Sequence, residues 1–315
     1  MDTSTISSSA EATAPRLGPA PVPAESAASG HRADDVARLV VKGTDQSGIV
    51  AAITETLAQF DGNIVSLDQH TSDPAGGRFF QRTVFTLPNL STVLEDLRRA
   101  LDARLADFKL DWQLIEAKKR KRTAVFVSKS DHCLLDLLWR QRRGELPMDI
   151  TMVISNHPDL SEDVRPFGIP YFYIPADRES RAEAEARQLE LLRGNVDLVV
   201  LARYMQIITE DFIEQAGVPI INIHHSFLPA FIGAAPYRKA KERGVKLIGA
   251  TAHYVTKDLD EGPIISQDVI HVSHRESAGD LQRRGADVER RVLSHAVQAH
   301  CEDRVIRDGN VTIVF

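Results

Sequence analysis

Four short runs of nearly uninterrupted apolar residues constrain the fold of this chain more than any other feature of its sequence. They cover residues 123–128 (TAVFVS), 149–155 (DITMVIS), 196–202 (VDLVVLA) and 219–224 (PIINIH). Such runs, rich in Val and Ile and separated by longer segments, are typical of parallel strands covered by helices on both faces. Sheets of this kind bind ligands at the carboxyl ends of their strands. The pattern predicts an α/β domain over residues 123–315 with its site at that edge.

The same domain contains further predicted elements. Helical spacing covers 133–143 and 180–193, and strand-like runs cover 170–173, 246–255 and 262–272. With the four apolar runs, these segments indicate a mostly parallel sheet.

A different pattern occupies residues 37–116. Strand-like and helix-spaced segments follow one another in the order β-α-β-β-α-β, and they cover 37–42, 49–60, 64–71, 79–87, 91–108 and 109–115. This order is a known plan for a small ferredoxin-like domain. The basic run at 117–122 (AKKRKR) is interpreted as a solvated linker between the two domains.

Residues 1–36 differ from the rest of the chain in composition. They consist largely of Ser, Ala, Pro and Gly, with few large apolar side chains. Such a segment cannot bury enough surface to offset its chain entropy, so it is predicted to be a disordered tail. It lacks the basic start and the apolar stretch of a secretory signal.

Bulk composition narrows the function classes. The net charge of −6 argues against a general nucleic-acid or membrane-surface binder, and no apolar run approaches the roughly 18–20 residues that span a bilayer. Cys133 and Cys301 can form neither a disulfide framework nor a zinc site with the usual spacing. We therefore expect a cytoplasmic protein with reduced thiols and no metal site.

Polar residues that can carry chemistry cluster near three strand ends. One strand runs into Asn222 and His224, a second carries His253, and residues 258–263 (DLDEGP) form a turn that contains Asp260. Each feature alone has a simple explanation, since Asp-Gly turns are common and a strand-end His is often only packed. The three together indicate a catalytic site.

This set matches the signature of the formyltransferase fold: an Asn-x-His pair, a later His on a strand, and an Asp-x-Asp-x-Gly turn. The chain resembles the formyltetrahydrofolate deformylases and, less closely, the glycinamide ribonucleotide and methionyl-tRNA formyltransferases. The resemblance implies that Asn222, His224 and Asp260 are catalytic and that His253 supports them. It also implies an enzyme that hydrolyses 10-formyltetrahydrofolate to formate and tetrahydrofolate without a cofactor, supplying formate to purine synthesis and balancing one-carbon folate pools.

The implied reaction accounts for these residue types. Removal of a formyl group from N10 passes through a tetrahedral intermediate with a developing oxyanion. The Asn222 amide and a protonated His224 can donate hydrogen bonds to that oxygen. Asp260 can accept a proton from the nucleophile, directly or through a water, and return one to N10, while His253 would orient Asp260.

A folate pocket is also implied by the resemblance. A flat heterocycle needs apolar walls and backbone groups that read its edge. Residues 201–208 resemble the family's pterin-binding loop, and the segment after residue 253 would face it. The expected substrate-binding residues are Arg203, Tyr204, Met205, Gln206, Ile207, Tyr254, Val255 and Thr256.

The first domain resembles an ACT domain, a small module that usually binds amino acids. The resemblance rests on residues 44–50 (TDQSGIV) and 61–64 (DGNI). Asp45, Gly48 and Asn63 are the candidate ligand-binding residues, because exposed backbone NH groups at a strand–helix turn can hold a carboxylate. The alternative is that this copy serves only subunit assembly. Either way, the resemblance implies a homo-oligomer.

Two features favour hydrolysis over formyl transfer. Residues 128–133 (SKSDHC) lack the glycines with which the ribonucleotide transferases cradle a phosphate. A methionyl-tRNA transferase would carry its extra domain after the catalytic core, whereas here the extra domain precedes the core. Three alternatives stay open: transfer to an amine acceptor of the glycinamide ribonucleotide type, a folate-binding regulatory protein, and a catalytic Cys133 beside His132.

Overall fold

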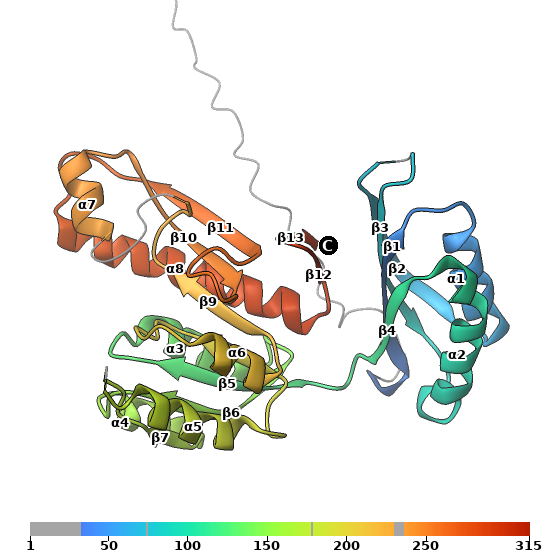
Figure 1. The fold of residues 1–315 in the computed structure, drawn as a ribbon, viewed down its shortest axis with the longest axis horizontal. Helices are drawn as coiled ribbons and strands as arrows, with labels where there is room; N and C mark the ends of the chain where they lie inside the picture. The colour runs from blue at the N-terminus through green and yellow to red at the C-terminus, as the bar shows by residue number, and fades with distance from the viewer. Residues whose placement is uncertain (1–32, 74, 178, 230–235) are drawn as a thin grey trace, which may run out of the picture. The chain divides into compact units, whose positions relative to one another are not determined.

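The computed structural model describes residues 33–73, 75–177, 179–229 and 236–315 (Figure 1). The predicted disordered tail, 1–36, therefore falls almost entirely outside the described residues. Its last four residues are ordered, because η2 (Ala33–Asp35) and the first residue of β1 lie there.

The N-terminal domain is a four-stranded antiparallel sheet in the order β2-β3-β1-β4. Its elements are β1 (Val36–Thr44), α1 (Ile49–Gln59), β2 (Asn63–Thr71), β3 (Arg78–Thr86), α2 (Leu90–Leu105), η3 (Ala106–Phe108) and β4 (Asp111–Glu116). Both helices lie on one side of the sheet in Figure 1. Leu39 and Val41 of β1 pack there against Ile53 of α1 and Leu97 of α2. The predicted β-α-β-β-α-β order is confirmed.

The second domain is built on a seven-stranded sheet in the order β11-β10-β9-β8-β5-β6-β7. Its strands are β5 (Lys121–Val127), β6 (Met148–Ser155), β7 (Tyr171–Tyr173), β8 (Leu198–Leu201), β9 (Ile220–His224), β10 (Leu247–Tyr254) and β11 (Ile264–His271). β5 to β9 pair in parallel, and β10 and β11 are antiparallel additions at one edge. The predicted mostly parallel α/β sheet is confirmed.

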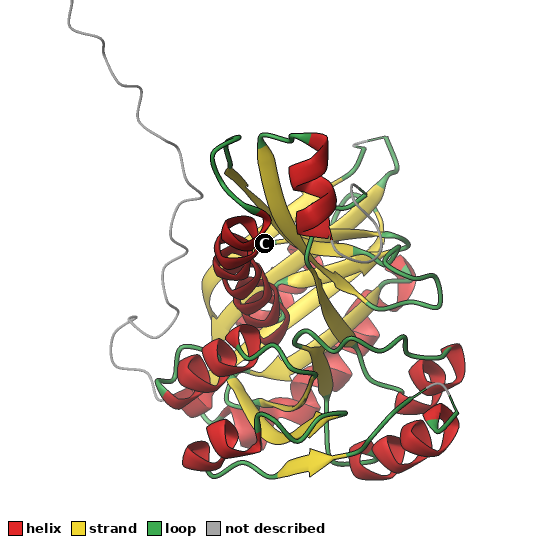
Figure 2. Ribbon diagram, turned by 90° about the vertical axis from the view of Figure 1, so that its left-hand side faces the viewer, coloured by secondary structure: helices red, strands yellow, loops and turns green. Residues whose placement is uncertain are grey.

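Helices cover both faces of this sheet, as the apolar runs predicted (Figure 2). They are α3 (His132–Arg142), α4 (Ser161–Val164), η4 (Arg165–Phe167), α5 (Arg181–Leu192), α6 (Glu210–Ala216), α7 (Pro236–Arg243) and α8 (Ala278–Cys301), followed by the hairpin β12 (Val305–Asp308) and β13 (Val311–Val314). Because side chains alternate along a strand, Val125 and Val127 of β5 pack with α3 and α8, whereas Ala124 and Phe126 pack with α5 and α6.

α8 is the longest described helix and was not predicted. It begins with a capping box, in which Ser277 and Asp280 each bond to the other's backbone NH. Leu281, Val288 and Val292 form a buried stripe at helical spacing along it.

The predicted linker ends earlier in the structure. β5 begins at Lys121, so the last two residues of the predicted linker, 117–122, belong to this strand. Arg122 is fixed there by an ion pair with Asp197, 2.8 Å away.

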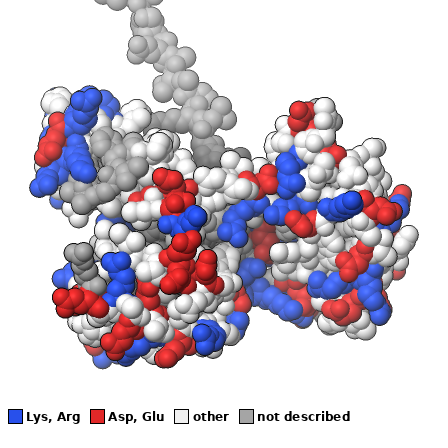
Figure 3. Space-filling model, in the orientation of Figure 1, with Lys and Arg blue, Asp and Glu red and all other residues white. Residues whose placement is uncertain are grey.

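Acidic and basic side chains are interspersed over the face shown in Figure 3, and Lys and Arg side chains gather over α7. Among the described helices, none has the length and apolarity needed to cross a membrane.

Candidate active site

Three of the predicted catalytic side chains are brought together by strand register. Asn222 and His224 are two positions apart on β9, so both point to the same face. β10 pairs with β9 so that His253 lies directly opposite Asn222. Cross-strand partners on one face are neighbours, and Asn222 Nδ2 is 3.3 Å from His253 Nε2.

Asp260 reaches this face from the loop between β10 and β11. Its backbone lies in the left-handed region, with φ at 58°, where Asp is tolerated better than most residues. The loop then folds back on β10, and Tyr254 N donates to Pro263 O at 2.9 Å. Gly262 permits this approach, because a Cβ there would lie 1.8 Å from Tyr254 O. Backbone geometry therefore fixes the carboxylate.

Asp260 lies between the two histidines. Its Oδ2 is 3.2 Å from His224 Nδ1, and its Oδ1 is 3.7 Å from His253 Nε2. Burial alone would raise the pKa of Asp260, but the adjacent imidazoles of His224 and His253 outweigh burial and hold this pKa well below the usual range of a carboxyl. Asp260 is therefore an ionised acceptor at neutral pH.

The histidines differ in their remaining contacts. His253 Nδ1 lies 2.9 Å from Tyr254 O, and because a carbonyl only accepts, Nδ1 carries the proton. His253 Nε2 can then accept from the Asn222 amide. His224 is 6% exposed, and its Nε2 has no hydrogen-bond partner among the described residues. A buried nitrogen of this kind is available to a ligand or to water.

The four side chains line a pocket of about 290 Å³. Its other walls come from Leu201, Ile223 and His225 and from two loops, which contribute Arg203, Tyr204, Met205, Gln206, Ile207, Ile208, Val255, Thr256, Lys257, Asp258 and Leu259. Met205, Ile207 and Leu259 are more than half exposed. Exposed apolar side chains around a concave pocket are typical of a binding site for a flat organic molecule.

The loop after β8 is held in place from the end of β5. Ser128 Oγ accepts from Met205 N at 2.9 Å, and Ser128 N donates to Arg203 O at 3.2 Å. The Ser128 hydroxyl in turn donates to Asn156 Oδ1 at 2.7 Å. These contacts tie the predicted pterin loop to the sheet edge where the catalytic set lies.

Tyr254 is the one predicted substrate-binding residue that does not line this pocket. It follows His253 on the same strand, so its side chain points to the opposite face. The phenol is buried and lies 2.8 Å from His300 Nδ1. Three further lining residues were not expected from the sequence, which are Ile223, His225 and Leu259.

Cys133 is a poor nucleophile in this setting. It is 1% exposed, and burial, together with the charge of Glu289, raises the pKa of its thiol well above the usual value. Because the thiolate is the reactive form, this environment disfavours the catalytic-cysteine alternative.

The candidate ligand residues of the first domain lie at two turns. Asp45 and Gly48 belong to the connection between β1 and α1, where Gly48 is the N-cap of α1 with φ at 96°. Asn63 is the first residue of β2 and is exposed.

A mostly parallel α/β sheet with Asn, His and Asp grouped at its edge, over a pocket with exposed apolar walls, is the arrangement expected of the formyl transferase class. The Formyl transferase family matches residues 121–297, and the ACT domain family matches residues 37–102. The formyltetrahydrofolate deformylase of Mycobacterium tuberculosis is 60% identical over 282 residues, which are 89% of this chain and 91% of the relative. The chain belongs to the formyltetrahydrofolate deformylase family.

Solved structures agree with this assignment. The crystal structure of a formyltetrahydrofolate deformylase from Pseudomonas syringae pv. tomato matches with a TM-score of 0.84 and 44% identity, covering 89% of this chain and 94% of that one. A glycinamide ribonucleotide transformylase from Symbiobacterium toebii matches with a TM-score of 0.58 and 33% identity, covering 62% of this chain and 94% of that one. The second match shows that a transformylase shares the fold over about two thirds of this chain.

Proposed function

We propose that this protein hydrolyses 10-formyltetrahydrofolate to formate and tetrahydrofolate. The observation that carries the proposal is the state of His224, whose Nδ1 faces the Asp260 carboxylate and whose buried Nε2 is unpartnered among the described residues. The pair lies in a pocket with apolar walls, and the chain's relatives carry the name of this activity.

The attacking water is placed at the His224–Asp260 pair. His224 Nε2 accepts a proton from the water while Asp260, held at Nδ1, stabilises the imidazolium that forms. The water oxygen bonds to the formyl carbon and the carbonyl oxygen becomes an oxyanion. Because the two groups are in contact, their titrations are coupled and belong to the pair.

Asn222 is placed to stabilise the oxyanion. One hydrogen of its amide group points to His253 Nε2, which leaves the other for the developing charge. The intermediate then collapses: the bond between the formyl carbon and N10 breaks, and the His224–Asp260 pair returns its proton to N10. His253 acts as a positioning residue for Asn222. These steps use water and side chains alone, without a cofactor.

The folate is placed along the two loops. Met205 and Ile207 on one side and Leu259 on the other offer apolar surface to the pterin, while backbone groups of residues 203–208 can read its edge. This position presents N10 and its formyl group to His224.

Regulation and assembly belong to the same proposal. The ACT domain suggests an amino-acid effector at Asp45, Gly48 and Asn63, and pairing of such domains would give a homo-oligomer. Two buried free cysteines fit a reducing, cytoplasmic location. Released formate would then supply purine synthesis and balance one-carbon folate pools.

The test is an assay of purified protein with 10-formyltetrahydrofolate alone. Formate and tetrahydrofolate should accumulate in equal amounts without any acceptor. Formyl loss only after addition of an amine would establish the transferase alternative instead. Folate binding without turnover under both conditions would establish the regulatory alternative.

A further inference from the structure

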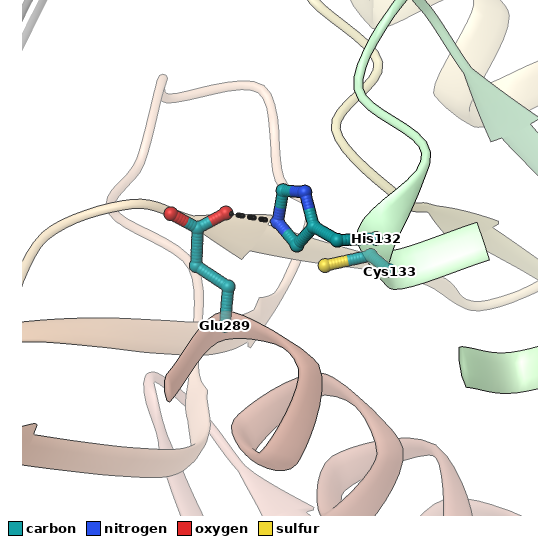
Figure 4. A group of neighbouring side chains, drawn as sticks. All are labelled: His132, Cys133 and Glu289. Carbon is teal, nitrogen blue, oxygen red and sulfur yellow. Dashed lines mark hydrogen bonds and ion pairs between the residues drawn. The ribbon is translucent and has the colours of Figure 1, made fainter. Parts of the chain in front are cut away.

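A second group of ionisable side chains lies beside the reaction centre, and these side chains take no part in the steps above. We call it the Glu289 cluster: Glu289 of α8, His132 at the start of α3, Arg203 after β8, and Tyr237 of α7. Glu289 Oε2 lies 2.8 Å from His132 Nε2 and 3.4 Å from Arg203 Nε. The Tyr237 hydroxyl donates to Glu289 Oε1 at 2.5 Å. Figure 4 shows His132 directed at the Glu289 carboxylate.

The cluster is held together by charge. The Glu289 side chain is only 2% exposed, and an unpaired carboxylate so deeply buried would be strongly destabilising. Burial alone would raise the pKa of Glu289, but His132, Arg203 and Tyr237 together hold it below the ordinary value. Glu289 is therefore ionised, and removal of any partner leaves part of a buried charge uncompensated.

Backbone packing is adapted to the same contact. Gly285 lies one turn before Glu289 within α8, where glycine is less favourable than alanine. A Cβ at Gly285 would lie 2.1 Å from the Tyr237 hydroxyl. Because only glycine leaves room for this ring, Gly285 allows Tyr237 to reach Glu289.

A metal ion is not the best occupant of the cluster. His132, Cys133 and Glu289 have ligand atoms within 4.8 Å of one another. However, both Glu289 oxygens already accept from protein donors, and the raised pKa of Cys133 opposes the thiolate that a metal needs. The fixed positive charge of Arg203 beside the carboxylate opposes a cation as well.

The cluster adjoins the pocket through two residues. Arg203 lines the pocket and contacts Glu289. His225 also lines the pocket, and its ring centroid is 5.2 Å from that of His224 and 6.2 Å from that of Tyr237. Burial, with the charges of Arg203 and His224, lowers the pKa of His225 to about 4, so its ring is neutral at pH 7. Arg203 and His225 thus form a wall with the Glu289 cluster behind it.

This wall stands where a second substrate would enter. In the binding mode proposed above, the side chains of residues 204–208 and 255–259 face the folate, which leaves the side chains of Arg203 and His225 for whatever attacks the formyl carbon. Since the fold is shared with a transformylase, the sheet itself does not restrict the acceptor. Side chains beside His224 must do so.

We propose that the Glu289 cluster is the specificity element that reserves the reaction centre for water. It fixes the side chains of Arg203 and His225 beside His224. The space left next to His224 then admits water but not an amine acceptor. The proposal rests on the hydrolysis proposed above. In the excluded reaction, the amine nitrogen would bond to the formyl carbon and lose a proton, the bond to N10 would break, and N10 would take a proton.

The test measures how each variant divides the formyl group between water and an amine. Wild type, Glu289→Gln and Tyr237→Phe are incubated with 10-formyltetrahydrofolate and the small amine glycinamide, and formate and formylglycinamide are quantified after subtraction of the uncatalysed reaction. The product ratio does not depend on the amount of folded enzyme, so a general loss of stability leaves it unchanged. Asp287→Asn is the matched control, because Asp287 is an exposed acid on α8 that pairs with Arg290.

Wild type and Asp287→Asn should give formate with little formylglycinamide. In Glu289→Gln, loss of the wall should raise the ratio of formylglycinamide to formate about tenfold or more, which is the usual effect of a change in pocket shape. In Tyr237→Phe, the ratio should rise as well. An unchanged ratio in both variants would overturn the inference. If Glu289→Gln does not fold, the Tyr237→Phe ratio decides alone. A wild type that releases no formate would instead contradict the proposed hydrolysis.

Discussion

His224 Nδ1 lies 3.2 Å from Asp260 Oδ2, and because the two residues are distant in sequence, the tertiary fold brings them together. The contact has a direction: the carboxylate is ionised, so it accepts from Nδ1 and leaves Nε2 as the reactive nitrogen. A carboxylate whose pKa is this low is a weak base by itself. We infer that Asp260 acts mainly through His224. This makes His224 the base that takes the proton of water, in place of the direct transfer to Asp260 and the oxyanion hydrogen bond from His224 that the resemblance implied.

Replacement of Asp260 tests this pair. Asp260→Asn keeps the size of the side chain and removes its charge, so kcat for formate release should fall by about 10²–10⁴-fold, the usual contribution of acid–base catalysis. Binding of tetrahydrofolate, measured by calorimetry, should change little. Glu261→Gln is the control, because Glu261 is the exposed neighbour in the same loop. A near-normal rate in Asp260→Asn would disprove the assignment.

Asn222 should act on the transition state more than on substrate binding. Asn222→Ala removes the amide donor next to His253, and kcat should fall about 10²–10³-fold with KM nearly unchanged. Steady-state kinetics separates the two parameters. A raised KM with normal kcat would assign Asn222 to folate binding instead.

The backbone that positions Asp260 can be tested at Gly262. In Gly262→Ala the new Cβ would collide with Tyr254 O, so the loop must move. We expect a loss of about 1–3 kcal/mol in the free energy of unfolding and reduced formate release. Gly279→Ala is the control, since its Cβ would be 3.7 Å or more from the nearest side-chain atoms. Equal behaviour of the two variants would contradict the role given to Gly262.

The sequence was most informative where residues with reactive side chains lie in a segment that has the apolar periodicity of a strand. Asn222 and His224 were expected from the Asn-x-His pair at a strand end, and their two-residue spacing puts both on one face of β9. The same rule, applied at β10, puts Tyr254 on the face opposite His253, where its hydroxyl lies beside His300. The ferredoxin-like and parallel-sheet plans were predictable because strands and helices differ clearly in apolar period.

Glu289 could not be identified as part of a site in this way. Its partners are distant in sequence, His132 by 157 residues and Tyr237 by 52, and such contacts depend on the tertiary fold. One local signal was present: Glu289 adjoins Val288 and Val292 on the buried stripe of α8. A charged residue on an apolar stripe is rarely unpaired, so the stripe predicts a buried partner without naming it.

Stability should decline in mild acid because of His225. Its pKa is about 4 in the folded chain against about 6.5 when unfolded, so between these values the unfolded chain binds more protons. The free energy of unfolding should therefore fall as the pH drops from about 6.5 to 4. His225→Gln should remove up to about 3 kcal/mol of that decline, leaving the share of His300, whose pKa is also about 4. Chemical denaturation at several pH values measures the slope, and identical slopes would contradict the burial of a neutral His225.

The most direct test of the central claim follows the oxygen of the attacking water. Wild-type protein is incubated with 10-formyltetrahydrofolate in ¹⁸O-labelled water without any amine, and the formate is analysed by mass spectrometry. Attack by water at the His224–Asp260 pair predicts one labelled oxygen per formate and an equal amount of tetrahydrofolate. Absence of formate, or formate that lacks the label, would contradict hydrolysis at this site.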